Sequence, residues 1–100
     1  MKYDKTRRED GTTVIAIEGT LDAVTAPELR QVVDELVQER CQLVELELSA
    51  LRLIDSSGVG VIVSLFKRLR AEGGQVKIVG LKDQPRAIFK LLRLDRVFPL

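Results

Sequence analysis

The chain has 100 residues, of which 45% are hydrophobic and 31% are charged, so it can bury one core but not two independent ones. Its formal net charge is +1 and it has no basic block with interleaved aromatic residues, which argues against nucleic acid as a partner. Histidine is absent and Cys41 is the only cysteine, so histidine-assisted nucleophiles and the usual zinc sites are excluded.

The chain begins with two predicted strands joined by a hairpin. Residues 3–8 are polar, whereas residues 12–18 are β-branched and mostly apolar and are followed by Gly19. The Glu-Asp-Gly cluster between the two segments is typical of a hairpin turn. Because the first strand is polar, we expect it at an edge of the sheet.

Residues 25–40 show the clearest helical pattern. Thr25 and Glu28 have the spacing of a capping box, and Pro27 falls in the first turn, where its missing N–H costs nothing. Apolar residues then recur at the helical spacing that produces one buried stripe. They are Leu29, Val32, Val33, Leu36 and Val37.

A third strand and a second helix are predicted next. Residues 43–48 alternate apolar with acidic side chains, which predicts a half-buried strand with Glu45 and Glu47 on a face that is at least partly wet. Residues 58–71 carry an apolar stripe at helical spacing. The glycine pair at 73–74 supplies the left-handed backbone that ends this helix.

The last predicted elements are a strand and a third helix. Residues 75–81 alternate as a strand does, and residues 83–93 are expected to form a helix with Asp83 as its cap. Residues 96–100 are too short to assign. The side chains of the third helix that are expected to point inward are Ala87, Ile88, Leu91 and Leu92.

The predicted order is therefore β-β-α-β-α-β-α, with no linker or repeat, over a single domain that spans residues 1–100. Strand-helix-strand crossovers are right-handed, so the last three strands are expected to be mutually parallel. The opening hairpin makes the sheet mixed. The fold class is a small α/β domain in which one mixed sheet packs against amphipathic helices.

The segment Asp55-Ser56-Ser57-Gly58 stands where an apolar run gives way to the second helix. Aspartate and serine are preferred helix N-caps, worth about 1 kcal/mol each, so capping is one explanation of the segment. A single cap accounts for one of its three polar residues, and the glycine can serve a tight turn. The other explanation is that one hydroxyl is chemically modified.

The position suits a modified serine. Binding sites of open α/β sheets gather at the carboxyl ends of strands, beside helix N-termini. Phosphorylation would add about −1.5 to −2 charges and three acceptor oxygens, which a helix N-terminus with free N–H groups can hold. Asp55, and Asp22 if its loop reaches the same place, would oppose the new charge. A partner fitted to the bare hydroxyl would then lose affinity.

Three stretches resemble one known family. Asp55-Ser56-Ser57-Gly58, followed by Val59-Gly60-Val61-Ile62, resembles the signature of the STAS domain, specifically of anti-sigma factor antagonists. Gly19-Thr20-Leu21-Asp22, followed by Ala26-Pro27-Glu28-Leu29, is similar to a second stretch of that family. Leu94-Asp95-Arg96-Val97-Phe98-Pro99 is similar to a third, and Gly73-Gly74 before a strand also resembles the family. The fold that the resemblance implies is STAS-like, and the matches run through nearly the whole chain in the right order.

The resemblance implies a bacterial partner-switching regulator of sigma-factor-dependent transcription. Ser57, the serine just before the glycine, would be the phosphoacceptor. The implied kinase is an anti-sigma factor of the histidine-kinase-like ATPase fold, which uses ATP and magnesium. The dephosphorylated antagonist would bind this kinase and free the sigma factor, and a metal-dependent serine phosphatase would regenerate it. The implied partner-binding residues are Asp22, Asp55, Ser56, Ser57, Gly58 and Gly60.

Two other interpretations are open. In the first, the chain is a STAS accessory subunit of a lipid-transport ABC complex, and the same surface docks the ATPase subunit without phosphorylation. In the second it is an enzyme, which the lack of histidine and of a glycine-rich phosphate loop argues against. No cofactor or metal is predicted.

The sequence also predicts where the protein is located in the cell, and it departs from the family at one position. The charged N-terminus and the lone cysteine predict a cytoplasmic protein without a signal peptide. No apolar stretch approaches the roughly 20 residues of a membrane span, so insertion into a membrane is not expected. The chain departs from the family at Leu92-Arg93, where a glycine often precedes Leu-Asp.

Overall fold

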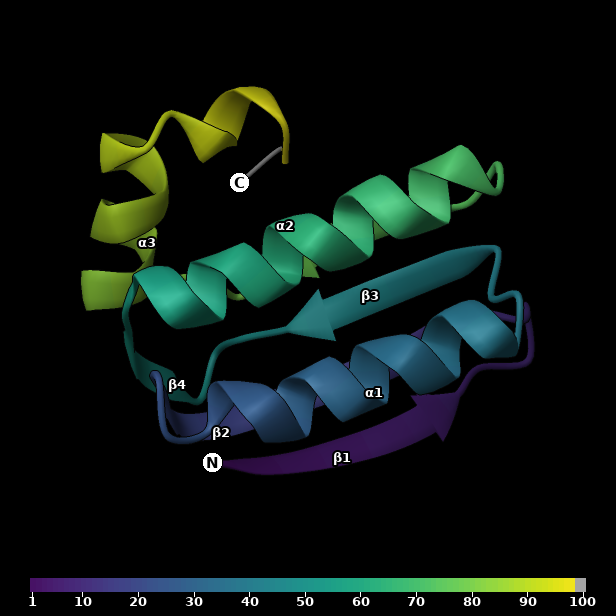
Figure 1. The fold of residues 1–100 in the computed structure, drawn as a ribbon, viewed down its shortest axis with the longest axis horizontal. Coiled ribbons are helices and arrows are strands. Elements are labelled where there is room, and N and C mark those ends of the chain that lie inside the picture. Colours follow the sequence, from purple (N-terminus) through teal and green to yellow (C-terminus); the bar gives the residue numbers. More distant parts are fainter. Residues whose placement is uncertain (99–100) are drawn as a thin grey trace.

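Five strands form one mixed sheet, and helices α1 and α2 lie side by side against one of its faces (Figure 1). The computed structural model describes residues 1–98, so residue 99, the last of the third family-like stretch, and residue 100 lie outside it. The strands are β1 (Lys2–Arg7), β2 (Thr13–Leu21), β3 (Leu43–Glu47), β4 (Leu51–Ile54) and β5 (Gln75–Val79). The helices are α1 (Ala26–Gln38), α2 (Ser56–Ala71) and α3 (Asp83–Leu91), followed by a short 3-10 turn at Leu94–Arg96.

The strand pairing confirms the predicted mixed sheet. β1 is antiparallel to β2 at one edge, and all of its side chains are exposed. β2 pairs in parallel with β3, and β3 pairs in parallel with β5. These are the three strands for which right-handed crossovers predict a common direction.

The predicted order lacks one strand, β4. This short strand pairs in parallel with the last part of β2, beyond the point where β3 ends. The turn at residues 49–50 separates β3 from β4, and the register of β2 shifts between Gly19 and Thr20. The observed order is therefore β-β-α-β-β-α-β-α. β4 matters for the site, because it leads directly into α2.

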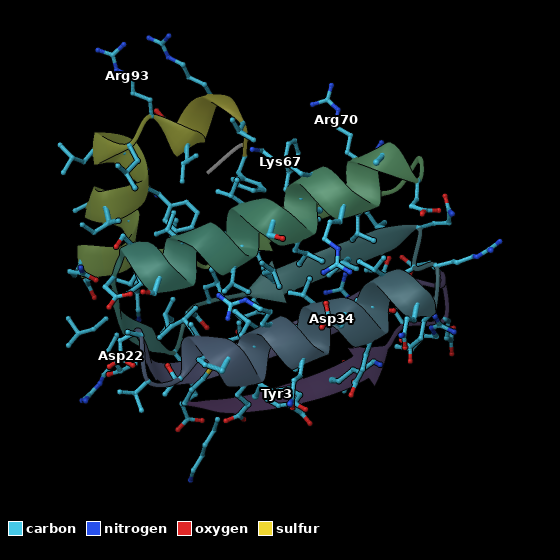
Figure 2. The ribbon with its side chains drawn as sticks, viewed as in Figure 1. Tyr3, Asp22, Asp34, Lys67, Arg70 and Arg93 are labelled. Atoms are coloured by element: carbon cyan, nitrogen blue, oxygen red, sulfur yellow. The ribbon has the colours of Figure 1, made fainter. Side chains whose placement is uncertain are left out.

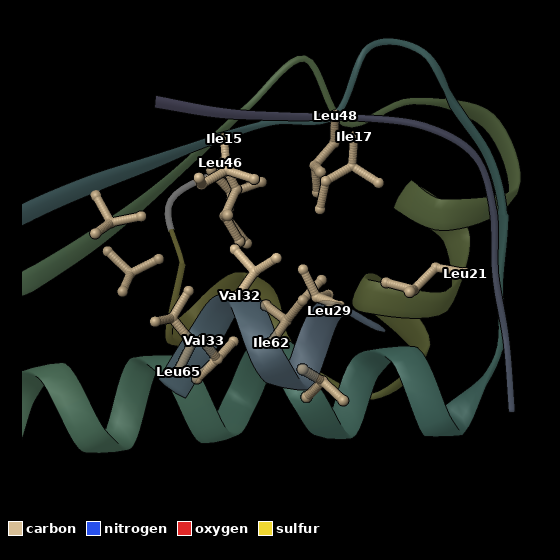
Figure 3. Close-up of a cluster of buried hydrophobic side chains, with 14 of the residues drawn as sticks. Ile15, Ile17, Leu21, Leu29, Val32, Val33, Leu46, Leu48, Ile62 and Leu65 are labelled. Atoms are coloured by element: carbon tan, nitrogen blue, oxygen red, sulfur yellow. The ribbon is translucent and has the colours of Figure 1, made fainter. Parts of the chain in front are cut away.

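The core lies between the sheet and the two helices. Buried side chains of α1 and α2, among them Leu29, Val32 and Ile62, face buried side chains of β2 and β3 (Figure 3). Glu45 departs from the predicted wet face, because only 6% of it is exposed. Arg8 holds both of its carboxylate oxygens, with N–O distances of 3.1 and 2.6 Å, which explains how this charge is tolerated.

The predicted inward face of α3 is wrong in part. Leu91 and Leu92 are 76% and 50% exposed and Ala87 is exposed, whereas Ile88 is half-buried. The buried residues of α3 are Pro85 and Phe89. The chain turns back after α3 and places Phe98 against the rings of Phe89 and Phe66, at centroid distances of 6.2 and 5.1 Å. This contact fixes which side of α3 is covered.

Two helix starts differ from the predicted caps. Lys82, not Asp83, is the N-cap of α3, and it makes no side-chain capping bond. Thr25 is the N-cap of α1 but also makes no side-chain capping bond, so the predicted capping box with Glu28 is wrong. Pro27 does lie in the first turn of α1, as predicted.

Candidate functional site

Asp22 and Asp55 follow the ends of two neighbouring parallel strands. Asp22 comes directly after β2 and Asp55 directly after β4, and the last residues of these strands, Leu21 and Ile54, are paired. The backbone N–H of Asp55 also donates to the carbonyl of Leu21 at 3.1 Å. Asp22 lies at the end of the molecule where α2 begins (Figures 1 and 2). The loop of Asp22 therefore does reach the serine segment.

Asp55 caps α2. Its backbone is extended, and its Oδ1 atom accepts hydrogen bonds from the N–H groups of Ser57 and Gly58, at 2.9 and 3.2 Å. Because of this cap, α2 begins at Ser56 and not at residue 58 as predicted. The cap explains the aspartate of the segment and leaves both serines unexplained.

The two serines occupy the first turn of α2. Ser56 is exposed and Ser57 is partly buried, so neither side chain is sealed inside the protein. Within residues 1–98, no side-chain hydrogen bond is formed by either hydroxyl. Both hydroxyls are therefore available to an incoming molecule.

Asp22 organises the loop between β2 and α1. Its Oδ1 atom accepts from the N–H groups of Val24 and Thr25, at 3.0 and 3.1 Å. The hydroxyl of Thr25 lies 2.9 Å from the N–H of Asp22, from which it accepts, and 3.1 Å from the carbonyl of Thr20, to which it donates. These bonds occupy the hydroxyl that the predicted capping box required. They also fix the position of Asp22 beside the start of α2.

The two glycines of the predicted site have different roles. Gly58 is buried, and a Cβ atom there would lie 2.6 Å from Cγ of Leu21 and 2.9 Å from Cγ1 of Ile54. Only glycine lets the first turn of α2 approach the ends of β2 and β4 this closely. Gly60 is exposed, and a Cβ atom there would have no heavy atom within 4 Å. Gly60 instead leaves the helix backbone without a side chain at a position that faces solvent.

Sequence reasoning missed three residues near these aspartates. Val24 and Leu53 are apolar side chains that are 85% and 50% exposed, and each lies two positions from one of the aspartates. Gln84 of α3 forms two hydrogen bonds with the backbone of Ile54, next to Asp55. The strand that contains Leu53 was not predicted, and no sequence pattern points to a contact between Gln84 and β4.

Residues 1–98 contain neither a candidate metal site nor a candidate membrane-spanning helix. In this part of the chain, no group of three or more acidic, cysteine or histidine side chains is placed to hold a metal ion. No helix there has the length and apolar character needed to cross a membrane.

A small α/β domain of this kind, with one mixed sheet and three helices, has the architecture of a STAS domain. The STAS domain family model matches residues 3–100, and the chain belongs to this family.

Proteins similar to this chain are anti-sigma factor antagonists. The anti-sigma F factor antagonist of Paenibacillus polymyxa is 29% identical over 91 residues, which cover 90% of this chain and 78% of that protein. The anti-sigma-B factor antagonist of Listeria monocytogenes is 27% identical over 86 residues, covering 86% and 75%. These relatives favour the regulatory interpretation over an accessory subunit of a lipid transporter.

Solved structures confirm the fold. The crystal structure of an anti-sigma factor antagonist from Mycobacterium paratuberculosis is similar, with a TM-score of 0.85 and 28% identity, over 99% of this chain and 85% of that one. The phosphorylated form of the Bacillus cell fate determinant SpoIIAA shares the fold, with a TM-score of 0.74 and 22% identity, over 97% and 88%. The predicted small mixed-sheet α/β class is therefore confirmed.

Proposed function

We propose that the protein is a cytoplasmic anti-sigma factor antagonist that acts by partner switching. In its unmodified form it binds an anti-sigma factor that is also a serine kinase of the histidine-kinase-like ATPase fold, and so frees a sigma factor. Transfer of the γ-phosphoryl group of ATP to the Oγ of Ser57 releases the kinase, with ADP and a proton as the other products. A metal-dependent serine phosphatase then hydrolyses the phosphoester and restores the binding form.

The observation that carries the proposal is that Asp55, and not Ser57, caps α2. Asp55 performs the capping, and the Ser57 hydroxyl is partly exposed with no side-chain hydrogen bond to the rest of residues 1–98. A serine retained only for capping would donate or accept at the helix start. Ser57 does neither, which favours a role toward another molecule.

Asp55 also explains why a phosphate on Ser57 would point toward the partner and not toward the start of α2. The sequence predicts that free N–H groups at the start of α2 hold the phosphate, but the N–H groups of Ser57 and Gly58 already donate to Asp55 Oδ1. A phosphate would have to displace this carboxylate or point away from it, and Asp55 and Asp22 repel it in either case. The dianion therefore faces the partner, where an unpaired, desolvated charge weakens binding.

The surroundings of Ser57 suit protein docking. Val24 and Leu53 offer exposed apolar surface close to Asp22 and Asp55, and apolar anchors surrounded by polar groups are typical of interfaces. Gly60, one turn after Ser57, lets a partner approach the helix backbone. In this proposal Gly58 contributes indirectly, because it is buried and sets the position of Ser57.

The test compares two substitutions at Ser57. Ser57→Ala is used as bait to capture the kinase, and calorimetric titration then measures the affinity of each variant for it. We expect Ser57→Ala to bind as the unmodified protein does, and Ser57→Asp to bind about 100-fold more weakly, about 3 kcal/mol. Ser49→Asp adds the same charge at an exposed serine before β4 and should leave the affinity unchanged.

Two results would contradict the proposal. One is a Ser57→Asp variant that binds the kinase as tightly as the wild type. The other is a Ser57→Ala variant that is folded but does not bind. Thermal denaturation of each variant accompanies the titration, because a substitution at a partly exposed first-turn position is expected to change stability by no more than about 1 kcal/mol.

A further inference from the structure

Both polar atoms of the Gln84 carboxamide form hydrogen bonds with the backbone of a single residue, Ile54. Its Oε1 atom accepts from the N–H of Ile54 at 2.9 Å, and its Nε2 atom donates to the carbonyl oxygen of Ile54, also at 2.9 Å. The two residues are 30 positions apart in the sequence. Gln84 lies in the first turn of α3, and Ile54 is the last residue of β4.

The carboxamide takes the place that a further strand would occupy. β4 pairs with β2 along one edge, and no other strand within residues 1–98 pairs with it. Ile54 is 3% exposed, so its outward N–H and carbonyl groups are shielded from water and need partners. Gln84 supplies one acceptor and one donor in the arrangement that a neighbouring strand presents.

The held residue is the one before the cap of α2. Asp55 donates its N–H to Leu21 on the β2 side, so the backbone of residues 54–55 is held from both edges of β4. Asp55 then holds the N–H groups of Ser57 and Gly58. A continuous series of hydrogen bonds thus runs from α3 through the end of β4 to the first turn of α2.

The backbone before Gln84 is shaped to make this contact. Asp83 has φ +54°, a left-handed conformation that is costly for a residue other than glycine and persists only where the surroundings impose it. It forms the turn by which α3 starts beside β4. The strained residue therefore lies directly before the side chain that reaches Ile54.

We propose that Gln84 is a positioning residue for Ser57: by holding the backbone of Ile54 it fixes the Asp55 cap and so places the Ser57 hydroxyl for phosphoryl transfer. The proposal rests on the proposed function, in which Ser57 is the acceptor. Phosphoryl transfer depends on the alignment of the attacking oxygen, and small displacements of a reacting group slow it strongly. The competing explanation is that Gln84 only anchors α3 to the sheet.

Amide hydrogen exchange, measured by NMR on the isolated protein, separates these two explanations. Gln84→Leu removes both bonds, whereas Gln84→Glu keeps an acceptor for the Ile54 N–H but has no donor for the Ile54 carbonyl at neutral pH. Gln38→Leu is the matched control, because Gln38 is exposed at the C-terminal end of α1, and this end of α1 lies far from the start of α2 (Figure 1).

We expect exchange to become about tenfold faster in Gln84→Leu, as for the loss of one or two hydrogen bonds. The affected amides are those of Ile54, Ser57 and Gly58. Gln84→Glu should have a smaller effect, and it provides the test if Gln84→Leu does not fold. Gln38→Leu should leave all three amides unchanged. Faster exchange at Ile54 with wild-type rates at Ser57 and Gly58 would overturn the proposal.

Phosphorylation kinetics add a second readout. With the captured kinase, Gln84→Glu should lower kcat about fivefold to tenfold with little change in KM, because the docking surface is intact and only the acceptor is misplaced. An unchanged kcat, or a change in KM alone, would count against positioning. The exchange experiment needs no kinase, so its failure concerns Gln84 alone. Failure of the wild type to be phosphorylated would instead count against the proposed function.

Discussion

Gly58→Ala and Gly60→Ala make the same chemical change two positions apart in one helix, and we expect opposite effects on stability. At Gly58 the new methyl group would lie 2.6 Å from Cγ of Leu21 and 2.9 Å from Cγ1 of Ile54. These contacts are too short, so either the start of α2 or the side chains of Leu21 and Ile54 must shift. At Gly60 the methyl group would meet no heavy atom within 4 Å.

The magnitudes follow from two opposing terms. Replacing glycine by alanine inside a helix stabilises it by about 0.5–1 kcal/mol, and this term is present at both positions. Overpacking of a tight core position costs about 1–3 kcal/mol, and this term is present at Gly58 alone. Gly60→Ala should therefore raise the free energy of unfolding by about 0.5–1 kcal/mol, and Gly58→Ala should lower it by up to about 2.5 kcal/mol, the overpacking cost less the helix gain.

Urea denaturation followed by far-UV circular dichroism measures both variants against the wild type. In a domain of this size, 1 kcal/mol corresponds to about 4–8 °C in Tm, so thermal melting also resolves the difference. Two variants of equal stability would refute the reasoning, because Gly58 would then not be in close contact with Leu21 and Ile54. A destabilised Gly60→Ala would refute the assignment of open space beside Gly60.

Three further predictions concern other parts of the chain. Arg93 has φ +58°, a left-handed conformation that glycine adopts without strain, so Arg93→Gly should raise the urea midpoint by the equivalent of about 0.5–1 kcal/mol. Arg8→Ala leaves the buried carboxylate of Glu45 unpaired and should cost about 2 kcal/mol, whereas a double variant with Glu45→Gln should recover part of this loss in the same denaturation assay. The hydrogen bond from Lys5 lowers the pKa of Glu39, so this pair stabilises the fold above pH 4.5, the ordinary pKa of the carboxyl, and the contribution is lost as the pH falls through the lowered value. Glu39→Gln should therefore show a smaller drop in urea midpoint between about pH 7 and pH 3 than the wild type, and an equal drop would contradict the assignment.

The parts of the fold that the sequence predicts are those with a strong local pattern. The apolar stripes of α1 and α2 and the alternation in β3 each reflect burial of one face, and that pattern is visible in the residues alone. The parallel direction of β2, β3 and β5 then follows from the handedness of the crossovers. The change from an apolar run to a helical pattern likewise predicts that the serine segment lies at a strand-to-helix junction.

The remaining features depend on contacts between distant residues. β4 has four residues and follows β3 after only three residues, 48–50, so the sequence does not show it as a separate apolar run. Leu91 and Leu92 are exposed because Phe98 returns to cover Phe89 instead. Thr25 and Glu28 satisfy a local capping rule, but the Thr25 hydroxyl binds Thr20 and Asp22. No local pattern encodes such pairings.

The same limit applies within the candidate site. Asp55 as an N-cap follows from local sequence preferences. The approach of Gly58 to Leu21 and the bonds from Gln84 to Ile54 require the packed sheet, because the partners are separated by tens of residues. The residues around Ser57 are predicted from a motif alone, whereas the contacts that hold them in place are visible only in the structure.

Mass spectrometry after incubation with the captured kinase, ATP and magnesium tests the central claim most directly. Wild type, Ser56→Ala and Ser57→Ala are compared at equal concentration. The account predicts one added phosphate, on Ser57, in the wild type and in Ser56→Ala, and none in Ser57→Ala. A phosphate on Ser57→Ala, or one that maps to Ser56 in the wild type, would contradict it.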